Sequence, residues 1–530
     1  MTNKINLIQK LKFNLWYFSR IFPIIGSPVR AIGKLSTTNF MKKYNNYLRK
    51  QGADIFPLDR YKREEDIPKQ FHLIKSDFAS KNDLKSIEML LNHLRIPFSL
   101  TSLSEIYDSF FDKFDTPPVL IGIKLSNDEL KKIKNILNKK THKIIIFSPV
   151  NNKTDKTNLI SYIDYDPLEM LPFNLGLRSE IVKKFVNILM ESEFMIITGF
   201  LPPQIALRID DVEGKNIKEY ISIITKHNWI PNLGIFLDEF KNNNNRSDFI
   251  SSLNKNDKVE ISPHAYNAKK FLFYDFPNGR PITESMFYEK WSSIEKDFTK
   301  WGCQISPVVN AHFHAYSKEN FELFKKKNIK YIFSEFFPSK LEPIPDKMYL
   351  PSGDPLCTTG QLIEKDIIQI YSGDSAACCN QSYSYYDFLM HTDVSNKVMS
   401  ALKRIKTKLD MSLFTGFASF ITTHESLINK LSSKDLADLF DKIDDYLNNN
   451  KFKPIKTKLS EIGRACENHT NIILYSVQKK NNKYIVKLKG NSNGDFCLVY
   501  FFKGQINYLN SSSFKGEKIV QIHSDEKKHE

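Results

Sequence analysis

The region from residue 202 to residue 452 alternates short apolar segments with helical patterns, and this rhythm restricts the fold more than any other feature of the chain. It begins after Pro202-Pro203, where the apolar segment 205–209 has the length of a strand. From Ile217 onward, apolar residues recur at i, i+3, i+4 and i+7, which predicts one buried face of a helix. Repeated strand–helix units over about 250 residues are typical of a (β/α) barrel. We therefore expect parallel strands here, covered by helices.

Polar residues follow several of the expected strands at the point where each strand ends. In an α/β barrel the carboxyl ends of the strands meet at one face, and the active site is built there. Because side chains alternate along a strand, Asn310, His312 and His314 share one face of their segment. The strand-end residues that become candidates are Asp210, Asp211, His264, His312, His314 and His424.

Two adjacent carboxylates, Asp210 and Asp211, end the strand that begins at Ile205. Like charges repel and lose hydration at the mouth of a buried strand, so the pair is costly unless a metal ion or a proton-transfer role offsets that cost. A solvated turn, in which Asp is common, is the alternative. An Asp together with two His suits a divalent metal with open positions, and zinc, iron, cobalt or manganese would fit.

Across about residues 200–450 these motifs resemble those of the polysaccharide deacetylases, the NodB-like group of the glycoside hydrolase/deacetylase superfamily. The first motif of that family is a strand that ends in two Asp residues, here Asp210-Asp211. The second supplies histidine ligands, and Ser262-Pro263-His264 is similar to its start. The last motif is a strand that ends in a His, as at Thr423-His424-Glu425.

Two motifs depart from the family pattern. A second His usually follows the first after four residues, but this chain has Ala268 at that position. The third motif normally carries an Arg and prolines, whereas this chain has Asn310-Ala311-His312-Phe313-His314. We infer that His312 or His314 replaces the absent ligand.

The resemblance implies a distorted (β/α) barrel of deacetylase type. It also implies a metal-dependent hydrolase, with zinc as the expected ion, that removes an acetyl group from a sugar or polysaccharide in cell-surface glycan metabolism. The expected roles are Asp210 as general base, His424 as general acid, and Asp211, His264 and one of His312 and His314 as metal ligands. The residues expected to contact substrate are Arg208, Tyr266 and Asn310, with Arg208 also placed to orient Asp210.

Two other functions fit the same residues. A glycoside hydrolase on the same barrel would use Asp210 as its nucleophile and would need a distant acid. A non-catalytic glycan-binding or scaffold protein would retain only a degenerate form of the site. Released acetate, a shortened glycan, or neither product would distinguish the three functions.

The pattern divides the chain into four parts. Residues 1–65 form a basic, aromatic lead-in, and residues 66–200 alternate short strands and helices as in a small parallel α/β domain. This second part carries no GxGxxG or P-loop pattern, so no nucleotide is assigned to it. The barrel spans 201–452, and 453–530 has closely spaced strands separated by Asn and Gly, as in a small antiparallel β domain.

Charge and cysteine content limit the partners. The chain of 530 residues has 76 Lys and Arg against 60 Asp and Glu, but the lysines are scattered, so we expect no nucleic acid. The basic, aromatic segment 11–35 is broken by Arg20 and Pro23, so we expect peripheral membrane contact rather than a span. Six cysteines without CxxC spacing favour a reducing compartment. The expected location is cytoplasmic, at the inner membrane face; the sequence does not indicate an oligomeric state.

Overall fold

The structure, a computed structural model, describes most of the chain after residue 70. The described ranges are 71–106, 118–137, 143–148, 160–170, 175–191, 195–198, 203–275, 280–312, 316–317, 319–334, 348–349, 361–362, 367–371, 397–415 and 418–523. The expected lead-in at 1–65 and His314 lie outside them, so membrane contact through the lead-in stays a prediction. Among the described helices, none has both the length and the apolar character that a membrane crossing requires.

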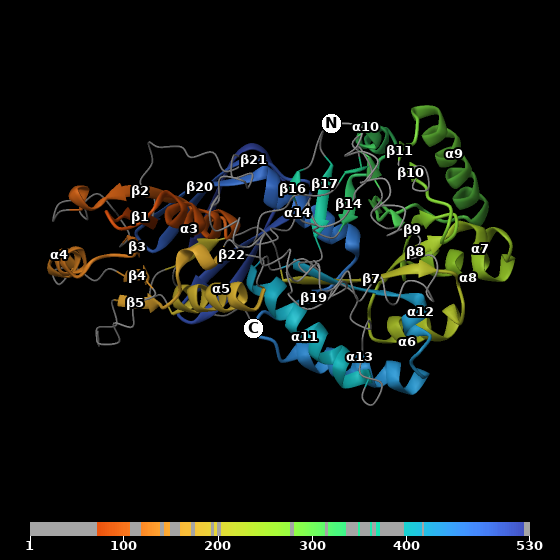
Figure 1. Cartoon of the computed structure of the whole chain (residues 1–530), viewed down its shortest axis with the longest axis horizontal. Coiled ribbons are helices and arrows are strands. Elements are labelled where there is room, and N and C mark those ends of the chain that lie inside the picture. Colours follow the sequence, from red (N-terminus) through yellow and green to blue (C-terminus); the bar gives the residue numbers. More distant parts are fainter. Residues whose placement is uncertain are drawn as a thin grey trace, which may run out of the picture.

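A five-stranded parallel sheet lies at one end of the molecule (Figure 1). Its strands are, in spatial order, β2 (Phe98–Ser102), β1 (Phe71–Lys75), β3 (Val119–Ile123), β4 (Lys143–Phe147) and β5 (Ile160–Ile163). Alternate residues of β3 enter different apolar clusters, with Ile121 in one and Leu120 in the other, because both faces of the sheet are covered. The helices that follow these strands are α3 (Lys81–His93), α4 (Asn127–Leu137) and α5 (Leu175–Met190).

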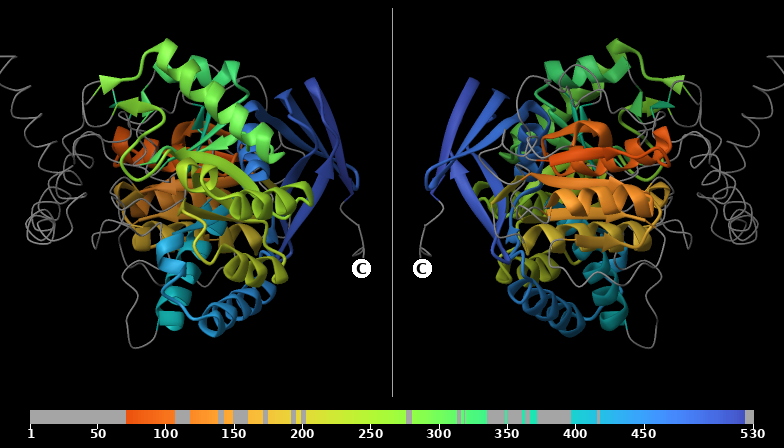
Figure 2. Two further views of the ribbon diagram at one scale, coloured as in Figure 1. Left: turned by 90° about the vertical axis from the view of Figure 1, so that its right-hand side faces the viewer. Right: turned by 90° about the vertical axis from the view of Figure 1, so that its left-hand side faces the viewer.

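The strands that carry the candidate site form two further sheets at the other end of the molecule (Figures 1 and 2). The first contains β18 (Ala418–His424), β7 (Gln204–Val212), β8 (Asn232–Phe236) and β9 (Glu260–Ala265) in that order, with β19 (Ile455–Lys456) beside β7. The second contains β12 (Val308–Val309), β14 (Tyr331–Ser334), β17 (Ile368–Tyr371) and β16 (Gln361–Leu362). Neighbours are parallel except for β16 and β17.

Among the described residues, one isolated bridge joins these two sheets. Ile261 of β9 pairs with Ile305, and the backbone N–H of Ser306 donates to Ile261 O at 2.8 Å. In the segment 305–309, only Val308–Val309 are in the ladder. The class is α/β with parallel sheets, as expected, but no pairing within the described residues joins β17 to β18 and closes a barrel.

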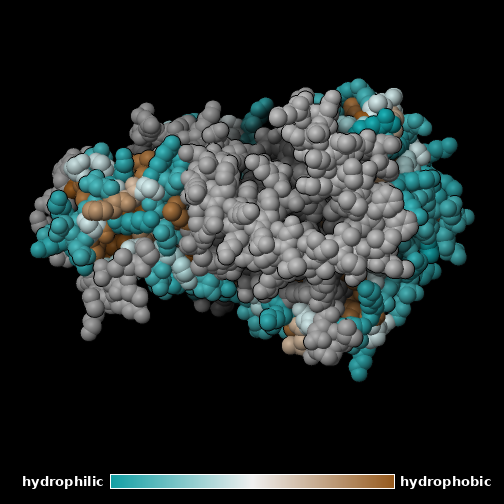
Figure 3. Space-filling model, viewed as in Figure 1, coloured by the Kyte–Doolittle hydropathy of each residue, from teal (hydrophilic) through white to brown (hydrophobic). Residues whose placement is uncertain are grey.

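Amphipathic helices cover the outside of these strands. The predicted face of α6 is buried, because Ile217, Tyr220, Ile221 and Ile224 all pack inward. Ser432 caps α13 by accepting the backbone N–H of Asp435. The outer surface over α7, α8 and α9 is hydrophilic (Figure 3). The helices are α6 (Ile217–Lys226), α7 (Leu237–Lys241), α8 (Asn244–Lys255), α9 (Glu284–Trp301), α10 (Glu319–Lys326), α11 (Lys397–Thr415), α12 (Glu425–Ile428) and α13 (Ser433–Asn448). Two short antiparallel pairs are β10 (Tyr274–Asp275) with β11 (Arg280–Pro281), and β13 (Tyr316–Ser317) with β15 (Met348–Tyr349).

The C-terminal part contains antiparallel strands, as expected, and a helix that the sequence analysis missed. Helix α14 (Leu459–Asn471) buries Leu459, Ile462 and Cys466. It precedes two three-stranded sheets, one of β20 (Ile472–Lys480), β21 (Lys483–Asn491) and β24 (Lys515–His523), and one of β23 (Gln505–Ser511), β22 (Phe496–Phe502) and β6 (Ile196–Thr198). An apolar cluster contains residues of both sheets.

Strand β6 lies before the expected boundary at residue 200, yet it pairs with β22 after the expected boundary at residue 453. Val499 pairs with Thr198, and Phe501 pairs with Ile196. Helix α14 also packs against β7, β17 and β18 of the site-bearing sheets. The C-terminal strands therefore share elements and contacts with earlier parts of the chain, and the four-part division stays a prediction.

Candidate active site

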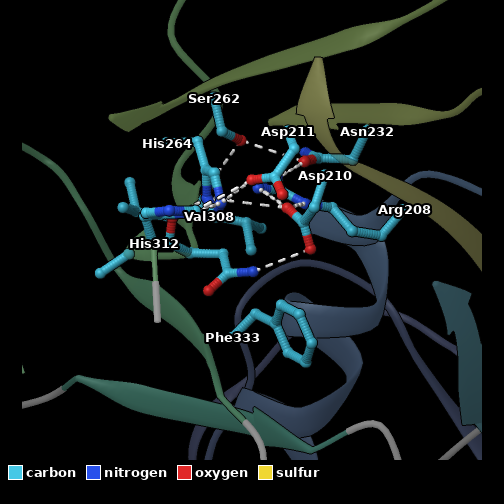
Figure 4. Close-up of polar contacts among 12 residues, drawn as sticks. Arg208, Asp210, Asp211, Asn232, Ser262, His264, Val308, His312 and Phe333 are labelled. Atoms are coloured by element: carbon cyan, nitrogen blue, oxygen red, sulfur yellow. Dashed lines mark hydrogen bonds and ion pairs between the residues drawn. The ribbon is translucent and has the colours of Figure 1, made fainter. Parts of the chain in front are cut away.

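A β-bulge at the end of β7 brings the two adjacent aspartates into one site. Ile209 pairs with Leu233 and Val212 with Ile235, so Asp210 and Asp211 together stand opposite Gly234. Adjacent strand residues normally point to opposite faces. Here the extra residue, with Asp211 in the left-handed region at φ 52°, re-aims the second side chain. Both carboxylates face His264 of β9 and His312, which follows β12 (Figure 4).

Arg208 holds Asp210 in place from two residues earlier on the same strand. Its Nε and Nη2 atoms lie 2.8 and 2.7 Å from Asp210 Oδ1, and the whole arginine side chain is buried. Asn310 Nδ2 donates to the other carboxylate oxygen at 3.0 Å. Burial opposes ionisation of Asp210, but the nearby Arg208 guanidinium and histidines outweigh it and lower the pKa of this carboxyl. Asp210 is therefore an oriented, ionised acceptor at neutral pH.

A layer of buried polar residues supports Arg208 from the neighbouring strands. Arg208 Nη1 donates to Asn232 Oδ1, and Ser262 Oγ donates to the same oxygen at 3.0 Å. Asn232 Nδ2 in turn lies 3.2 Å from Glu260 Oε2 and from Ser306 Oγ. Buried polar groups stabilise one arrangement when each is satisfied. This network fixes the guanidinium that orients Asp210.

Asp211, His264 and His312 form a triangle of potential metal ligands. Asp211 Oδ1 lies 3.1 Å from His264 Nε2 and 3.1 Å from His312 Nδ1, and the two nitrogens are 3.1 Å apart. Three bonds of about 2.1 Å to a tetrahedral ion would place their ligand atoms about 3.4 Å from one another. The observed spacing is close to this value, so the three side chains fit a divalent ion.

Hydrogen bonding around the triangle also suits a metal. His264 Nδ1 lies 2.8 Å from the backbone oxygen of Asn310, so this nitrogen donates and Nε2 carries the free lone pair. Asp211 Oδ1 is buried, and its described polar neighbours are the two histidine nitrogens of the triangle. Asp211 Oδ1 and His264 Nε2 are both acceptors and lie 3.1 Å apart, so they repel unless a cation or a proton lies between them. A second register shift, between Ile235 and Phe236, places His264 in this position on β9.

The pKa values of two of these residues favour the forms that bind metal. Burial opposes the charge of Asp211, but the histidines around it outweigh burial and hold the pKa of this carboxyl well below its ordinary value. Burial lowers the pKa of His312, which favours the neutral imidazole despite the nearby Asp211. The rings of Phe236 and Phe271 pack against His312, with centroids 5.4 and 5.3 Å away. A metal requires a carboxylate and neutral imidazoles.

His424 lies at the carboxyl end of β18, beside the aspartates. In the parallel ladder it pairs with Asp210, and its Nε2 lies 3.7 Å from Asp211 Oδ2. The next residue, Glu425, is buried, and its carboxylate accepts hydrogen bonds from the turn that follows Asp211. The site thus combines a held carboxylate, a ligand triangle and a histidine on its edge.

Most residues selected from the sequence come together here. Arg208 is fully buried beneath Asp210, and its N–H groups donate to Asp210 and Asn232. This position suits a residue that orients Asp210 rather than one that contacts substrate. The described contacts of Tyr266 include Lys241, the 267–270 turn and the backbone N–H of Asp238, all outside the cluster. The pKa of its hydroxyl is raised to about 12 by burial and then by carboxylates outside the cluster. His314 lies outside the described residues.

Sequence reasoning missed three contributors to the site. Asn232 and Glu425 stand next to or between selected motifs, but no spacing rule distinguishes them from ordinary polar residues. Gly234 has a clearer signal, since it interrupts an otherwise apolar strand. A Cβ atom at this position would lie 2.3 Å from Arg208 Nη2. The glycine therefore leaves the space in which Arg208 and Asp210 meet.

No known family's sequence profile matches this chain, and no curated protein matches it. Among solved structures, a proposed polysaccharide deacetylase from Mycobacterium smegmatis matches with a TM-score of 0.34 and 11% identity, over 49% of this chain and 88% of that one. The peptidoglycan N-acetylglucosamine deacetylase Bc1960 has a TM-score of 0.30 and 10% identity, over 50% and 90%. A 4-alpha-glucanotransferase from Thermococcus litoralis matches with a TM-score of 0.31 and 9% identity, over 50% of this chain and 40% of that one. At these values, only the residues of the site itself can support a function.

Proposed function

We propose that this protein is a metal-dependent hydrolase that removes an acetyl group from a sugar or polysaccharide. The observation that carries the proposal is the Asp211–His264–His312 triangle beside Asp210, a carboxylate that Arg208 and Asn310 already orient. A structural turn would not need three converging ligand atoms next to a buried, held carboxylate.

Asp211, His264 and His312 would hold the metal, and zinc is the ion that best suits two imidazoles and one carboxylate with an open position. Iron, cobalt and manganese also accept this ligand set. When bound, the ion would polarise the acetyl carbonyl and lower the pKa of a bound water.

The protein's own residues would move the protons. Asp210, kept ionised by Arg208, accepts a proton from the attacking water, whose oxygen forms the new bond to the acetyl carbon. His424 donates a proton to the departing amine nitrogen as the carbon–nitrogen bond breaks. The products are acetate and a free amino sugar. An O-acetyl substrate would release an alcohol in place of the amine.

The two other functions have weaker support. Glycoside hydrolysis needs a second carboxyl group facing the substrate. Glu425, a buried carboxyl group that directly follows His424, directs both oxygens to backbone N–H groups and to Tyr220 instead. A non-catalytic glycan-binding protein would not require Arg208 and Asn310 to hold Asp210. The proposal also includes a carbohydrate partner, which Tyr266 and Asn310 would contact. It further includes a cytoplasmic location at the periphery of the membrane.

Metal content tests the proposal directly. Elemental analysis of the purified protein should find about one transition metal ion per chain, and Asp211→Ala and His264→Ala should each lose it. The wild type should then release acetate from a panel of N- and O-acetylated glycans, whereas Asp210→Asn should retain metal but not activity. A wild type that stays free of metal after supplementation would refute the hydrolase. Metal binding with shortened glycans and no acetate would indicate the glycoside hydrolase.

A further inference from the structure

We propose that Glu425 is a positioning residue, one that holds the general acid His424 and the metal ligand Asp211 as a single rigid unit. The inference rests on the proposed function, since it assigns a task within that site. Glu425 directly follows His424 at the junction of β18 and α12, and its side chain is only 1% exposed. It points toward the turn after Asp211, away from the ligand triangle.

The carboxylate of Glu425 collects the amide groups of that turn. The backbone N–H of Glu213 donates to Oε2 at 2.6 Å, and the N–H of Gly214 lies 3.0 Å from both oxygens. Tyr220 of α6 donates its hydroxyl to Oε1 at 2.8 Å. One side chain from β18–α12 thus fixes backbone and side-chain groups that follow β7.

The turn needs such an anchor because of its backbone conformation. Asp211, Gly214 and Asn216 all have positive φ, so successive amides turn inward rather than joining a ladder. Arg246 holds the opposite side of the turn by donating Nη1 to Glu213 O at 2.8 Å. Asn429 of the α12 end donates to Lys215 O at 3.2 Å. Glu425 supplies the acceptor for the amide side, which no other described residue does.

The nature of these partners indicates a purpose beyond packing. Within the described residues, the groups that donate hydrogen bonds to Glu425 are uncharged amides and one phenol, and the cation that acts on it electrostatically, Lys215, is exposed to solvent. A buried carboxyl group without a hydrogen-bonded counter-charge is costly, and an apolar residue would fill the space more cheaply. The carboxylate of Glu425 instead fixes the end of β18 relative to the end of β7. His424 and Asp211 lie on those ends, with 3.7 Å between Nε2 and Oδ2.

The test uses the full chain with Glu425→Gln, which keeps the shape but turns an NH₂ group toward donors. Residues that orient metal ligands typically change metal affinity or activity by about 10–100-fold when altered. We expect zinc affinity, measured by competition with a chromophoric chelator, to fall about tenfold. On the most active acetylated glycan of the panel, kcat should fall at least tenfold with KM nearly unchanged, and the pH profile of kcat should shift because His424 loses its fixed surroundings.

Two further variants separate positioning from stability. Glu467→Gln is the matched control, because Glu467 also accepts a tyrosine hydroxyl, from Tyr331 at 2.7 Å, but lies on α14. It should leave zinc affinity and kcat unchanged. Glu425→Asp keeps the charge on a shorter side chain, and it should recover part of the lost kcat. If Glu425→Gln does not fold, Glu425→Asp alone still decides, since it should show a smaller loss in the same two quantities.

The outcomes separate this inference from the proposed function. If the wild type binds zinc and releases acetate, and both Glu425 variants match it, the positioning role is refuted while the hydrolase stands. If the wild type neither binds zinc nor releases acetate, the hydrolase fails. The anchor can then be judged by hydrogen exchange, where the amides of Glu213 and Gly214 should exchange faster in Glu425→Gln. Unchanged exchange would refute the anchor as well.

Discussion

Replacing Gly234 with alanine would disturb the Arg208–Asp210 pair without removing either charge. The added Cβ would lie 2.3 Å from Arg208 Nη2 and 2.6 Å from Asp210 Oδ1, whereas ordinary contacts start at 3.4 Å. The guanidinium or the carboxylate must therefore move by about 1 Å, and a shift of that size in a catalytic group costs about 100-fold in rate. Gly234 does not have a positive φ, so the effect would come from space alone.

The loss of stability follows from the same contact. Overpacking a filled core costs about 1–3 kcal/mol, and this shift is a smaller perturbation than removal of one partner of a buried ion pair, which costs about 3–5 kcal/mol. We expect the free energy of unfolding in urea to fall by about 3 kcal/mol in Gly234→Ala. Acetate release at 25 °C, where the variant is still folded, should show kcat reduced about 100-fold.

Gly463→Ala is the matched control for this experiment. A Cβ there would lie 2.5 Å from the ring of Tyr331, so α14 would also be overpacked. Stability should fall by about 1–3 kcal/mol, but kcat and zinc affinity should stay at wild-type values. If Gly234→Ala keeps the wild-type kcat, or if Gly463→Ala loses as much, Arg208 does not orient Asp210 as we infer.

Three other predictions address metal, pH and the support of His312. Zinc at about 100 times its Kd should raise the free energy of unfolding by about 2.7 kcal/mol, and chelation should reverse this in the wild type but not in His264→Ala; equal melting curves would contradict it. Burial raises the pKa of Glu425 to about 7 from 4.5, despite the hydrogen bonds from Tyr220 and the turn. Its contribution to stability is therefore full below pH 4.5 and is lost as pH rises through 7, by about 3 kcal/mol. In urea unfolding, the free energy of unfolding of Glu425→Gln should rise relative to that of the wild type between about pH 5 and 8. A difference between the two proteins that stays constant with pH would refute this. The buried Tyr316 hydroxyl donates to Val309 O at 2.9 Å and accepts the Ala311 N–H at 2.7 Å, so Tyr316→Phe should cost about 1–3 kcal/mol of unfolding free energy and weaken zinc binding. A variant with unchanged zinc affinity would show that this hydroxyl does not support His312.

Periodicity and strand-end position predicted much of this molecule because both reflect burial. The helical spacing from Ile217 predicted the buried face of α6, and the alternation of short strands and helices over 66–200 predicted parallel strands there. The carboxyl ends of parallel strands lie together, so Asp211, His264 and His312 could be selected without knowledge of their contacts. These features depend on local pattern and on general topology.

The remaining features depend on contacts between distant residues, which no local pattern records. Strict alternation would have placed Asp210 and Asp211 on opposite faces, and only the bulge against Gly234 brings them together. Whether Arg208 reaches substrate or lies beneath Asp210 depends on Asn232, a residue of another strand. Helix α14 was missed because its few apolar residues lie in a polar segment, which the structure buries against three strands.

The pairing of β6 with β22 has a consequence for how the chain is made. Residues 196–198 leave the ribosome long before 496–502, and β7 (204–212) precedes its partner β18 (418–424) by a shorter but still long interval. The edges of these early strands therefore stay unpaired until synthesis is nearly complete, and such edges promote aggregation. Non-local pairings of this kind also slow folding. Newly made chains would need protection by chaperones, and a premature stop before β22 would leave the edge of β6 open.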